Sequence, residues 1–422
     1  MSYKIIIYMR MEAADRRVRS GVQCVGIPFF YVLQMIFFRE KMNIMSQKLS
    51  NNWNNVETII IYGLGAVADR FIDKIMSEFK VPYIIDQNKQ GMRYKNIPVV
   101  AYETIRREIK EKKLKIVVMT SKRIYADIRR NLEKDGLIER EDFCGIEQFV
   151  VEWYKTNKNM LNIIQVNTAV TTWCSLNCKK CNMFMPHYEN DKRHHYTFGE
   201  MKEDIDLLLQ FVDYIFLYSF LGGEPFLNKE LKDIITYVGE KYADRIGKLG
   251  LTTNGTIIPD KETLQILKKY NVMISISDYT ATVVYGKKLD SFIKTLDEWN
   301  ITYTRNEMTE WKDFGFPEAP FRWGTDGVCK HMENCAPLFH GINDKKLFYC
   351  HVIWSADKAG IYTVPKQDYI NLVELDSANQ DDRERVSRYC AGQCERGFLG
   401  FCMVCGGCGE DNDRIIAAGE QW

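Results

Sequence analysis

Between residues 160 and 310, short apolar runs alternate with segments in which apolar residues recur every three or four positions. The runs predict buried strands at 162–170, 214–220, 248–252, 272–277 and 301–305. The periodic segments predict amphipathic helices near 198–211, 229–242, 259–270 and 287–299. Repeated β–α units of this kind imply a parallel sheet, whose functional residues gather at the carboxyl ends of the strands. The pattern therefore predicts an α/β fold in which the loops after the strands carry the chemistry.

Residues 55–150 repeat this alternation on a smaller scale, with strands predicted at 58–62, 81–85 and 116–119. Gly63 and Gly65 follow the first strand, and Asp86 ends the second. This is the layout of a Rossmann unit, in which glycines let the backbone approach a pyrophosphate and the acid binds a ribose hydroxyl. A tight β–α turn requires glycine even without a ligand. The sequence therefore predicts a Rossmann-like domain and leaves its ligand binding open.

Residues 1–54 form an N-terminal segment with an apolar run at 21–38 that follows three arginines. The run resembles a membrane anchor or a signal segment, but Pro28 interrupts it and no small-residue cleavage pattern follows. Three interpretations stay open: a true start of translation at Met42 or Met45, a peripheral or packed helix, and a membrane span. We favour the first, and therefore expect a cytoplasmic protein without a membrane span.

The chain has 422 residues, which exceeds one ordinary domain core and indicates two or three domains. Hydrophobic residues make up 46% and charged residues 27%, a composition typical of soluble globular proteins. The formal net charge of +1 argues against broad electrostatic attraction to nucleic acid or to a membrane. The thirteen cysteines are clustered rather than spread, which indicates metal ligands in a reducing compartment instead of a disulfide framework.

Three cysteines, Cys174, Cys178 and Cys181, stand within eight residues shortly after the strand predicted at 162–170. Clustered thiolates are soft ligands that suit iron or zinc, and three protein ligands rather than four leave one metal position open for chemistry. The alternative is a structural zinc knuckle completed by a histidine such as His187. Zinc sites more often pair their thiols as CxxC units, so the spacing favours an iron–sulfur cluster.

Three further motifs follow the cysteines, each at the end of a predicted strand: Gly222-Gly223-Glu224-Pro225, Thr252-Thr253-Asn254-Gly255 and Ser275-Ile276-Ser277-Asp278. Their order and the CxxxCxxC spacing resemble the radical S-adenosylmethionine (SAM) enzymes. The resemblance implies that a [4Fe-4S] cluster is held by Cys174, Cys178 and Cys181, with SAM chelating its fourth iron. It also implies a partial (β/α)6 barrel over residues 160–325.

The same resemblance assigns roles in SAM binding to the other motifs. The methionine amino group would be held by Gly222, Gly223, Glu224 and Pro225. Ribose and carboxylate contacts would come from Thr253, Asn254, Ser275 and Ser277. One position departs from the family pattern, because Lys180 stands before the third cysteine, where an aromatic residue usually packs near the adenine. Adenine packing must then come from elsewhere in the chain.

The predicted strands are one fewer than the implied barrel requires. Five strands are predicted between 160 and 310, whereas a partial (β/α)6 barrel has six. We therefore expect the sixth strand within 311–325, where the apolar pattern is weak.

Eight further cysteines lie near the end of the chain: Cys329, Cys335, Cys350, Cys390, Cys394, Cys402, Cys405 and Cys408. Eight thiols can ligate two four-iron clusters completely. The first three resemble the opening of the SPASM extension of radical SAM enzymes, a domain that carries auxiliary clusters. The spacing of the other five cysteines departs from the SPASM pattern. The resemblance implies such an extension over residues 326–422. Sequence order assigns one cluster to Cys329, Cys335, Cys350 and Cys405, and the other to Cys390, Cys394, Cys402 and Cys408. The alternative is a zinc ribbon built from Cys402, Cys405, Cys408 and either Cys390 or Cys394.

The cysteine count also bears on the reaction. Assignment of eleven cysteines to clusters leaves only Cys24 and Cys144, both outside the predicted barrel. Radical SAM epimerases commonly use a cysteine to return a hydrogen atom, so epimerisation is disfavoured. Auxiliary clusters suit a net oxidation, in which the substrate radical loses a proton to a base and an electron to a cluster. Asp278 is our candidate base, with His187 and His195 as rivals, although an aspartate that ends a strand usually caps a turn.

Two oxidative functions compete on this basis. The Rossmann-like domain resembles nucleotide-binding modules attached to sugar- and polysaccharide-modifying enzymes, which favours dehydrogenation of a sugar-, cyclitol- or nucleotide-linked small molecule. The alternative is a radical SAM/SPASM maturase that oxidises or crosslinks a peptide or protein. A third interpretation, a non-enzymatic iron–sulfur or zinc sensor, differs because a sensor would not cleave SAM when reduced. As partners we expect a small-molecule or peptide substrate and a flavodoxin- or ferredoxin-type electron donor, and no nucleic acid.

Overall fold

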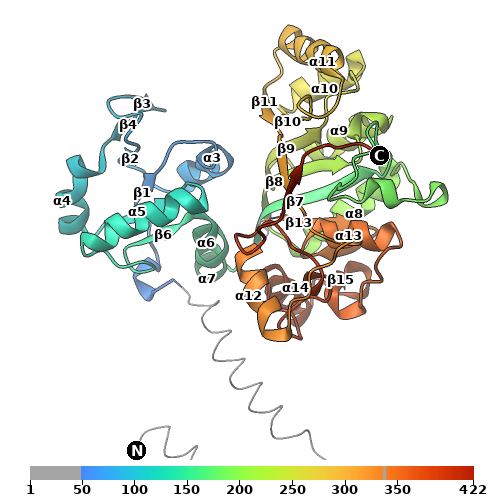
Figure 1. Ribbon diagram of the computed structural model, residues 1–422. Coiled ribbons are helices and arrows are strands. Elements are labelled where there is room, and N and C mark those ends of the chain that lie inside the picture. The colour runs from blue at the N-terminus through green and yellow to red at the C-terminus, as the bar shows by residue number, and fades with distance from the viewer. Residues whose placement is uncertain (1–48, 336–338) are drawn as a thin grey trace, which may run out of the picture. The chain divides into compact units, whose positions relative to one another are not determined.

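The structure is a computed structural model that describes residues 49–335 and 339–422 (Figure 1). The apolar run at 21–38 and the candidate start residues Met42 and Met45 lie outside the described residues. Within the described ranges, no helix is both long enough and apolar enough to cross a membrane. Helices alternate with parallel strands in two large sheets, and two further strands form a small separate sheet.

The first sheet has six strands in the order β3-β4-β2-β1-β5-β6. Their bounds are β1 (Ile59–Tyr62), β2 (Ile84–Ile85), β3 (Arg93–Tyr94), β4 (Ile97–Val100), β5 (Lys115–Val118) and β6 (Phe143–Gly145). All adjacent pairs are parallel except β3 with β4. Ile59 and Ile61 pack in one cluster with α3 (Ala68–Glu78), whereas Ile60 packs in another with α4 (Tyr102–Lys112) and α5 (Lys122–Lys134). Successive strand side chains point to opposite faces, so helices cover both faces of this sheet.

The turn after β1 is held by the chain's own groups. Gly63 has a φ of +104°, and a Cβ at this position would lie 2.6 Å from the Thr120 side chain. The carboxylate of Asp86 accepts a hydrogen bond of 2.9 Å from the Leu64 N–H. It also accepts hydrogen bonds from the N–H groups of Asn88 and Lys89. Packing and turn geometry thus account for Gly63 and Asp86, and contact of Gly63, Gly65 and Asp86 with a ligand stays a prediction.

The second sheet has eight strands in the order β11-β10-β9-β8-β7-β13-β14-β15. Their bounds are β7 (Asn162–Thr171), β8 (Tyr214–Gly222), β9 (Ile246–Thr253), β10 (Met273–Asp278), β11 (Tyr303–Glu307), β13 (Phe339–Asn343), β14 (Lys346–Phe348) and β15 (Tyr369–Asn371). The strands from β11 to β13 are all parallel, and β14 and β15 are antiparallel. Because β11 and β15 form two separate edges, the sheet is an open, partial barrel.

Four helices connect the parallel strands, namely α8 (Phe198–Phe211), α9 (Leu231–Lys241), α10 (Lys261–Lys269) and α11 (Gly286–Trp299). The first begins with a capping box, in which Thr197 and Glu200 each bond the other's backbone N–H. The other helices are α6 (Ile146–Gln148), α7 (Tyr154–Lys158), α12 (Thr325–Cys335), α13 (His351–Lys358) and α14 (Gln380–Cys390). The small sheet pairs β12 (Glu310–Lys312) with β16 (Ile415–Ala417). The helices and strands predicted from periodicity between 160 and 310 are confirmed.

The sixth parallel strand is β13, so the prediction that it lies within 311–325 is wrong. This strand pairs with β7, on the side of the sheet opposite to β11. Its sequence has no continuous apolar run, yet His340 and Asn343 are buried, and Asn343 exchanges two hydrogen bonds with the backbone of Ala169. Apolar periodicity misses a strand whose buried side chains are polar and are satisfied by distant elements. Since β13, β14 and β15 belong to residues 326–422, the predicted extension contributes strands to the barrel sheet.

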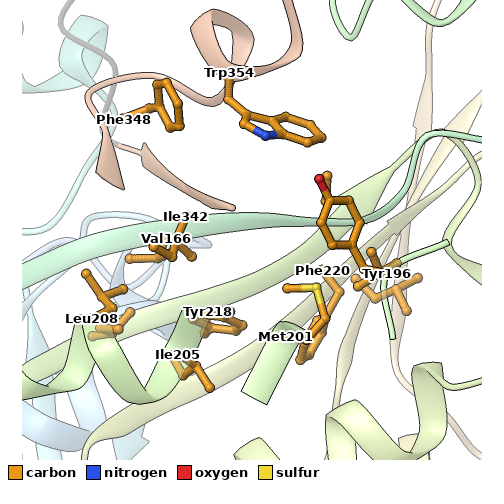
Figure 2. Packing of buried hydrophobic residues seen from close by; sticks show 14 of the residues in the cluster. Val166, Tyr196, Met201, Ile205, Leu208, Tyr218, Phe220, Ile342, Phe348 and Trp354 are labelled. Carbon is orange, nitrogen blue, oxygen red and sulfur yellow. The ribbon is translucent and has the colours of Figure 1, made fainter. Parts of the chain in front are cut away.

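The barrel core packs against one face of the central strands, as Figure 2 shows. Val166 of β7 and Tyr218 of β8 are register partners, and Ile205 and Leu208 of α8 pack over them. All four side chains are buried. The next residue of β7, Asn167, must point to the opposite face, which is the face on which the candidate site described below is found.

Asp204 of α8 lies beneath the hairpin between β13 and β14. Its carboxylate accepts a hydrogen bond of 2.6 Å from the Lys345 N–H, and the side chain is buried. Asp344 and Lys345 form the hairpin turn with φ values of 55° and 62°, in the left-handed region. The hydrogen bond from the Lys345 N–H to Asp204 helps to hold this turn. Burial raises the pKa of Asp204 to about 7.

This pKa predicts a pH dependence of stability. The folded protein keeps the Asp204 proton up to about pH 7, whereas an unfolded chain releases it near pH 4, so the folded state binds more protons in this window. The free energy of unfolding should therefore fall as pH rises from about 4 to 7, by about 4 kcal/mol for this group. Asp204→Asn keeps an acceptor for the Lys345 N–H and should remove this contribution. The check is the thermal midpoint of both proteins at pH 5 and pH 8; an equal loss in both contradicts the prediction.

Candidate active site

A cavity of about 220 Å³ lies at the carboxyl ends of the parallel strands. It brings together residues from all four motifs: Cys174, Cys178, Cys181, Gly222, Gly223, Thr253, Asn254 and Ser277. A larger cavity, of about 340 Å³, lies near the amino end of β9 and is lined by none of the motif residues. Because functional residues of parallel α/β sheets gather at the carboxyl ends, the smaller cavity is the candidate active site.

The thiols of the cysteine loop face this cavity from the segment that follows β7. Burial raises the pKa of Cys174 to about 12, that of Cys178 to about 11, and that of Cys181 in the same direction. These thiols are therefore protonated at neutral pH until a metal displaces the protons. His187, the fourth ligand of the alternative zinc knuckle, lies 3.1 Å from the Glu318 carboxylate and does not line the cavity.

The donor set suits a cluster better than a single ion. Among the described residues, no three His, Cys, Asp or Glu side chains converge closely enough to hold one metal ion. A four-iron cluster takes one thiolate on each iron, so its ligands stand further apart than the ligands of a single ion. Three soft thiols around one cavity therefore fit a [4Fe-4S] cluster with one open iron.

Gly222 and Gly223 lie directly against the backbone that enters the cysteine loop. A Cβ at Gly222 would lie 2.2 Å from the Thr171 carbonyl oxygen, and a Cβ at Gly223 would lie 2.0 Å from the Trp173 carbonyl oxygen. The Gly223 and Glu224 N–H groups donate to these two carbonyls, at 2.9 and 2.8 Å. Only glycine permits this approach, which fixes the cysteine loop to the end of β8.

Glu224 is fully buried beneath the cavity and joins two of the motifs. Its carboxylate accepts hydrogen bonds from Thr253 Oγ1 at 2.8 Å, from the Asn254 N–H at 2.9 Å and from the Phe226 N–H at 3.3 Å. Burial raises the pKa of Glu224 to about 7. Pro225, the last residue of the motif, is also buried and begins the helical turn Pro225–Leu227. The carboxylate thus positions the strand end of β9, and its contact with SAM stays a prediction.

The serine and asparagine residues of the later motifs differ in position. Asn254 Nδ2 donates to Ser175 Oγ at 3.1 Å and lies 3.7 Å from Cys174 Sγ, so it touches the cysteine loop directly. Ser277 lines the cavity, whereas Ser275 lies one pleat further back on the same strand face and accepts from Asn306 Nδ2 at 3.1 Å. The geometry supports a ligand contact for Ser277 more directly than for Ser275.

None of the three candidate bases lines the cavity. Asp278 is buried, lies 2.7 Å from Arg305 Nη2 and accepts from the Thr280 N–H at 2.8 Å. Burial would raise the pKa of Asp278, but the hydrogen bonds from Thr280 and Arg305 outweigh it and lower the pKa. His195 Nδ1 lies 2.9 Å from Thr171 Oγ1. These contacts explain Asp278 as a turn-capping residue in an ion pair, and a role as base stays a prediction.

The sequence interpretation missed His351, the first residue of α13, which lines the cavity. Its Nδ1 lies 3.1 Å from Asn167 Nδ2, and Asn167 Oδ1 in turn accepts from Gln165 Nε2 at 2.8 Å. An amide nitrogen only donates, so Nδ1 accepts and Nε2 carries the ring proton. Burial lowers the pKa of His351 to about 4. The available signal was its position directly after Cys350, a predicted cluster ligand, because the chain neighbour of such a residue lies close to the bound group.

Two aromatic residues form part of the cavity wall. Tyr279 and Trp311 line the cavity and contact each other edge to face, with ring centroids 5.3 Å apart. Lys180, which replaces the usual aromatic residue, instead reaches Glu318 at 3.1 Å. Tyr279 and Trp311 are therefore the aromatic surfaces available beside the cysteine loop.

Two of the eight later cysteines that sequence order assigns to different clusters are in contact. Cys335 Sγ lies 3.8 Å from Cys408 Sγ, and this contact, with burial and Cys350 adding to it, raises the pKa of Cys335. Burial raises the pKa of Cys405 to about 12, with Cys350 and Cys408 adding to the effect. Burial also raises the pKa of Cys394 to about 12 and Cys329 contributes. The 3.8 Å contact places Cys335 beside Cys408, whereas Cys402 is near Cys350, Cys405 and Cys394 alike, so the division of the eight thiols into two cluster sites stays a prediction.

The assignment by sequence order put Cys335 with Cys329 rather than with Cys408. Cys329 and Cys335 both belong to α12 and are six residues apart, so they point to different sides of the helix. Order along the chain cannot reveal this. The 3.8 Å contact also argues against a self-contained zinc ribbon of Cys402, Cys405 and Cys408, because the Cys408 thiol contacts Cys335 on a separate helix.

Comparisons with known proteins agree with the order of the motifs. Residues 168–290 match the sequence profile described as the Radical SAM superfamily. No curated protein sequence matches the chain. Similar solved structures include BtrN in complex with AdoMet and 2-DOIA, with 14% identity over 60% of this chain and 98% of that one and a TM-score of 0.38. They also include Streptococcus suis SuiB bound to S-adenosylmethionine, with 16% identity over 56% and 49% and a TM-score of 0.29.

A third similar structure is native anSMEcpe with bound AdoMet, with 13% identity over 55% of this chain and 90% of that one and a TM-score of 0.34. The superfamily match covers β8, β9 and β10 together with the cysteine loop and the three later motifs. These are the residues that the structure gathers around one cavity. The chain therefore contains a radical SAM domain, and radical SAM enzymes use a [4Fe-4S] cluster together with S-adenosylmethionine.

Proposed function

We propose that this protein is a radical SAM oxidoreductase that dehydrogenates a sugar-, cyclitol- or nucleotide-linked small molecule, with auxiliary [4Fe-4S] clusters as electron acceptors. One observation carries the proposal. The cavity bounded on one side by Cys174, Cys178 and Cys181 is bounded on another by His351, whose chain neighbour is Cys350 of the auxiliary group. A substrate in this cavity would therefore lie between the cysteine loop and a residue adjacent in the chain to a predicted auxiliary ligand.

The residues of the radical SAM domain would bind and orient the cofactors. Cys174, Cys178 and Cys181 would hold the first cluster, and the backbone of Gly222 and Gly223, together with Thr253, Asn254 and Ser277, would contact SAM. When bound, these cofactors supply a 5′-deoxyadenosyl radical that takes a hydrogen atom from the substrate, which then loses a proton to a base and an electron to an auxiliary cluster, while SAM is consumed.

The cavity wall would orient the substrate and exclude water. With Nδ1 bonded to Asn167, His351 has an Nε2–H that can donate to a substrate oxygen. Tyr279 and Trp311 offer flat apolar surfaces for the adenine or a sugar ring, in place of the aromatic residue that Lys180 replaces.

The auxiliary cysteines would hold two clusters. The contact between Cys335 and Cys408 supports one site at Cys335, Cys350, Cys405 and Cys408, which would leave Cys329, Cys390, Cys394 and Cys402 for the second. Of the two cysteines left over, Cys144 is fully buried in the first sheet, far in the chain from the cavity residues, and Cys24 lies outside the described residues. Cys144 therefore offers no hydrogen-atom donor at the cavity, which supports oxidation over epimerisation.

The test separates SAM cleavage from oxidation. Protein reconstituted without oxygen is reduced with dithionite and incubated with SAM and a panel of sugars, cyclitols and nucleotide sugars. We expect 5′-deoxyadenosine and a product two hydrogen atoms lighter than its substrate. Cys350→Ala should still release 5′-deoxyadenosine but lose the oxidised product, whereas Cys144→Ala should retain both. A product of unchanged mass, or full oxidation by Cys350→Ala, would contradict the proposal, and oxidation of a precursor peptide alone would favour the maturase.

A further inference from the structure

The segment that contains residues 418–422 lies along the cysteine loop of the radical SAM domain. The Lys179 N–H donates to the Glu420 carbonyl at 2.7 Å, and the Trp422 N–H donates to the Asn177 carbonyl at 3.1 Å. Cys178 and Gln421 form an antiparallel bridge between these bonds. The loop that holds the first three cysteines is therefore paired, residue by residue, with a segment more than two hundred residues away.

The side chain of Gln421 contacts a cysteine of this loop directly. Its Oε1 accepts from the Asn177 N–H at 2.7 Å, and its Nε2 lies 3.1 Å from Cys178 Sγ. The first bond fixes the orientation of the amide, because only the oxygen can accept from a backbone N–H. The nitrogen must then face the sulfur. By comparison, the Leu176 N–H and Asn254 Nδ2 lie 3.5 and 3.7 Å from Cys174 Sγ.

The other side of the segment is anchored to the cavity wall. The Ala418 N–H donates to the Thr309 carbonyl at 3.0 Å, and Thr282 Oγ1 donates to the Ala418 carbonyl. Gly419 has a φ of +75°, and a Cβ there would lie 2.9 Å from Tyr279, which lines the cavity. Just before it, β16 pairs with β12. In Figure 1 this dark red part of the chain runs past β13 to end beside the loop that follows β7. Gln421 is therefore positioned beside Cys178 by a segment that forms hydrogen bonds along its length.

We infer that Gln421 is a positioning residue that raises the reduction potential of the cluster at Cys174, Cys178 and Cys181 by donating its amide N–H to Cys178 Sγ. Reduction adds negative charge to a cluster and its sulfur ligands, so a hydrogen bond to a sulfur stabilises the reduced form more than the oxidised form. The inference rests on the proposed function in one respect, the presence of a four-iron cluster on these three cysteines. Gln421, a residue of the C-terminal extension, would thereby make reduction of the SAM cluster more favourable.

The test is a redox titration of the full chain, reconstituted without oxygen and followed by electron paramagnetic resonance. The signal of the SAM cluster is isolated by subtracting the titration of the Cys174→Ala, Cys178→Ala, Cys181→Ala variant. Gln421→Leu removes the N–H at similar size, and Gln421→Glu keeps an acceptor for Asn177 but replaces the N–H by a charge. We expect a more negative midpoint for Gln421→Leu and a still more negative one for Gln421→Glu, with iron content unchanged.

The matched control is Glu420→Gln, which keeps the backbone pairing and loses only an exposed ion pair with Lys179. Its midpoint should stay at or slightly above that of the unmodified protein. Equal midpoints for the unmodified protein and both Gln421 variants overturn the inference. Loss of the cluster from both variants also overturns it, because Gln421 would then be needed for structure rather than potential. If the three-cysteine variant loses no iron, the proposed function fails instead, and the two failures are thereby distinguished.

Discussion

Simultaneous replacement of Cys174, Cys178 and Cys181 by alanine is expected to lower the iron content from about twelve to about eight per chain and to abolish SAM cleavage. The three thiols line one cavity with Gly222 and Gly223, and their removal leaves no thiol among the residues that line it. Iron and sulfide are measured on protein purified and reconstituted without oxygen. 5′-Deoxyadenosine is measured after reduction with dithionite in the presence of SAM.

The matched control is Cys144→Ala, which removes a fully buried thiol of the first sheet. It should keep about twelve irons and full cleavage. Unchanged iron in the triple variant would contradict a cluster on the cysteine loop. About four irons and bound zinc in the unmodified protein would mean that the later cysteines are structural. The oxidative mechanism would then give way to a redox-neutral radical reaction.

The second large effect is expected for Gly223→Ala. The new Cβ would lie 2.0 Å from the Trp173 carbonyl oxygen and 2.9 Å from the Cys174 nitrogen, both of which are backbone atoms. Neither can swing aside as a side-chain end could, so the cysteine loop and the end of β8 must separate. A displacement of about 1 Å at a reacting centre costs on the order of a hundredfold in rate, and we expect SAM cleavage to fall by at least that factor.

Gly286→Ala is the appropriate comparison, because a Cβ at Gly286 meets no atom within 4 Å and the residue begins α11. Alanine favours a helix over glycine, so this variant should be neutral or slightly more stable. SAM cleavage is compared in the two variants at equal iron content. Equal cleavage by Gly223→Ala and Gly286→Ala would show that the close approach of Gly223 to Trp173 is not needed for the site.

Several features of the site could be predicted from the chain because they are local. CxxxCxxC spacing, paired glycines and strand-end serines are short stretches whose chemistry does not depend on distant contacts. Each also follows a strand that apolar periodicity identifies, and parallel strands bring their carboxyl ends to one edge. These two facts explain why one cavity is lined by Cys174, Gly223, Asn254 and Ser277.

Other features depend on contacts between distant segments, and the chain alone does not reveal them. The strand β13 is polar in sequence and is buried only because Asn343 bonds the backbone of β7. Cys408 contacts Cys335, although the two are 73 residues apart in the chain. Asp278 has the sequence context of a base, but Arg305 on the neighbouring strand engages it in an ion pair.

Periodicity and motif spacing therefore determined the order of strands and helices between 160 and 310 and the residues offered to the cofactors, because both depend on neighbours in sequence. Tertiary structure decided which further residues share the cavity. His351 reaches it from α13, and Gln421 reaches Cys178 across 243 residues of chain. Such contacts depend on how separate elements pack, and packing among distant side chains leaves no periodic signal in the sequence.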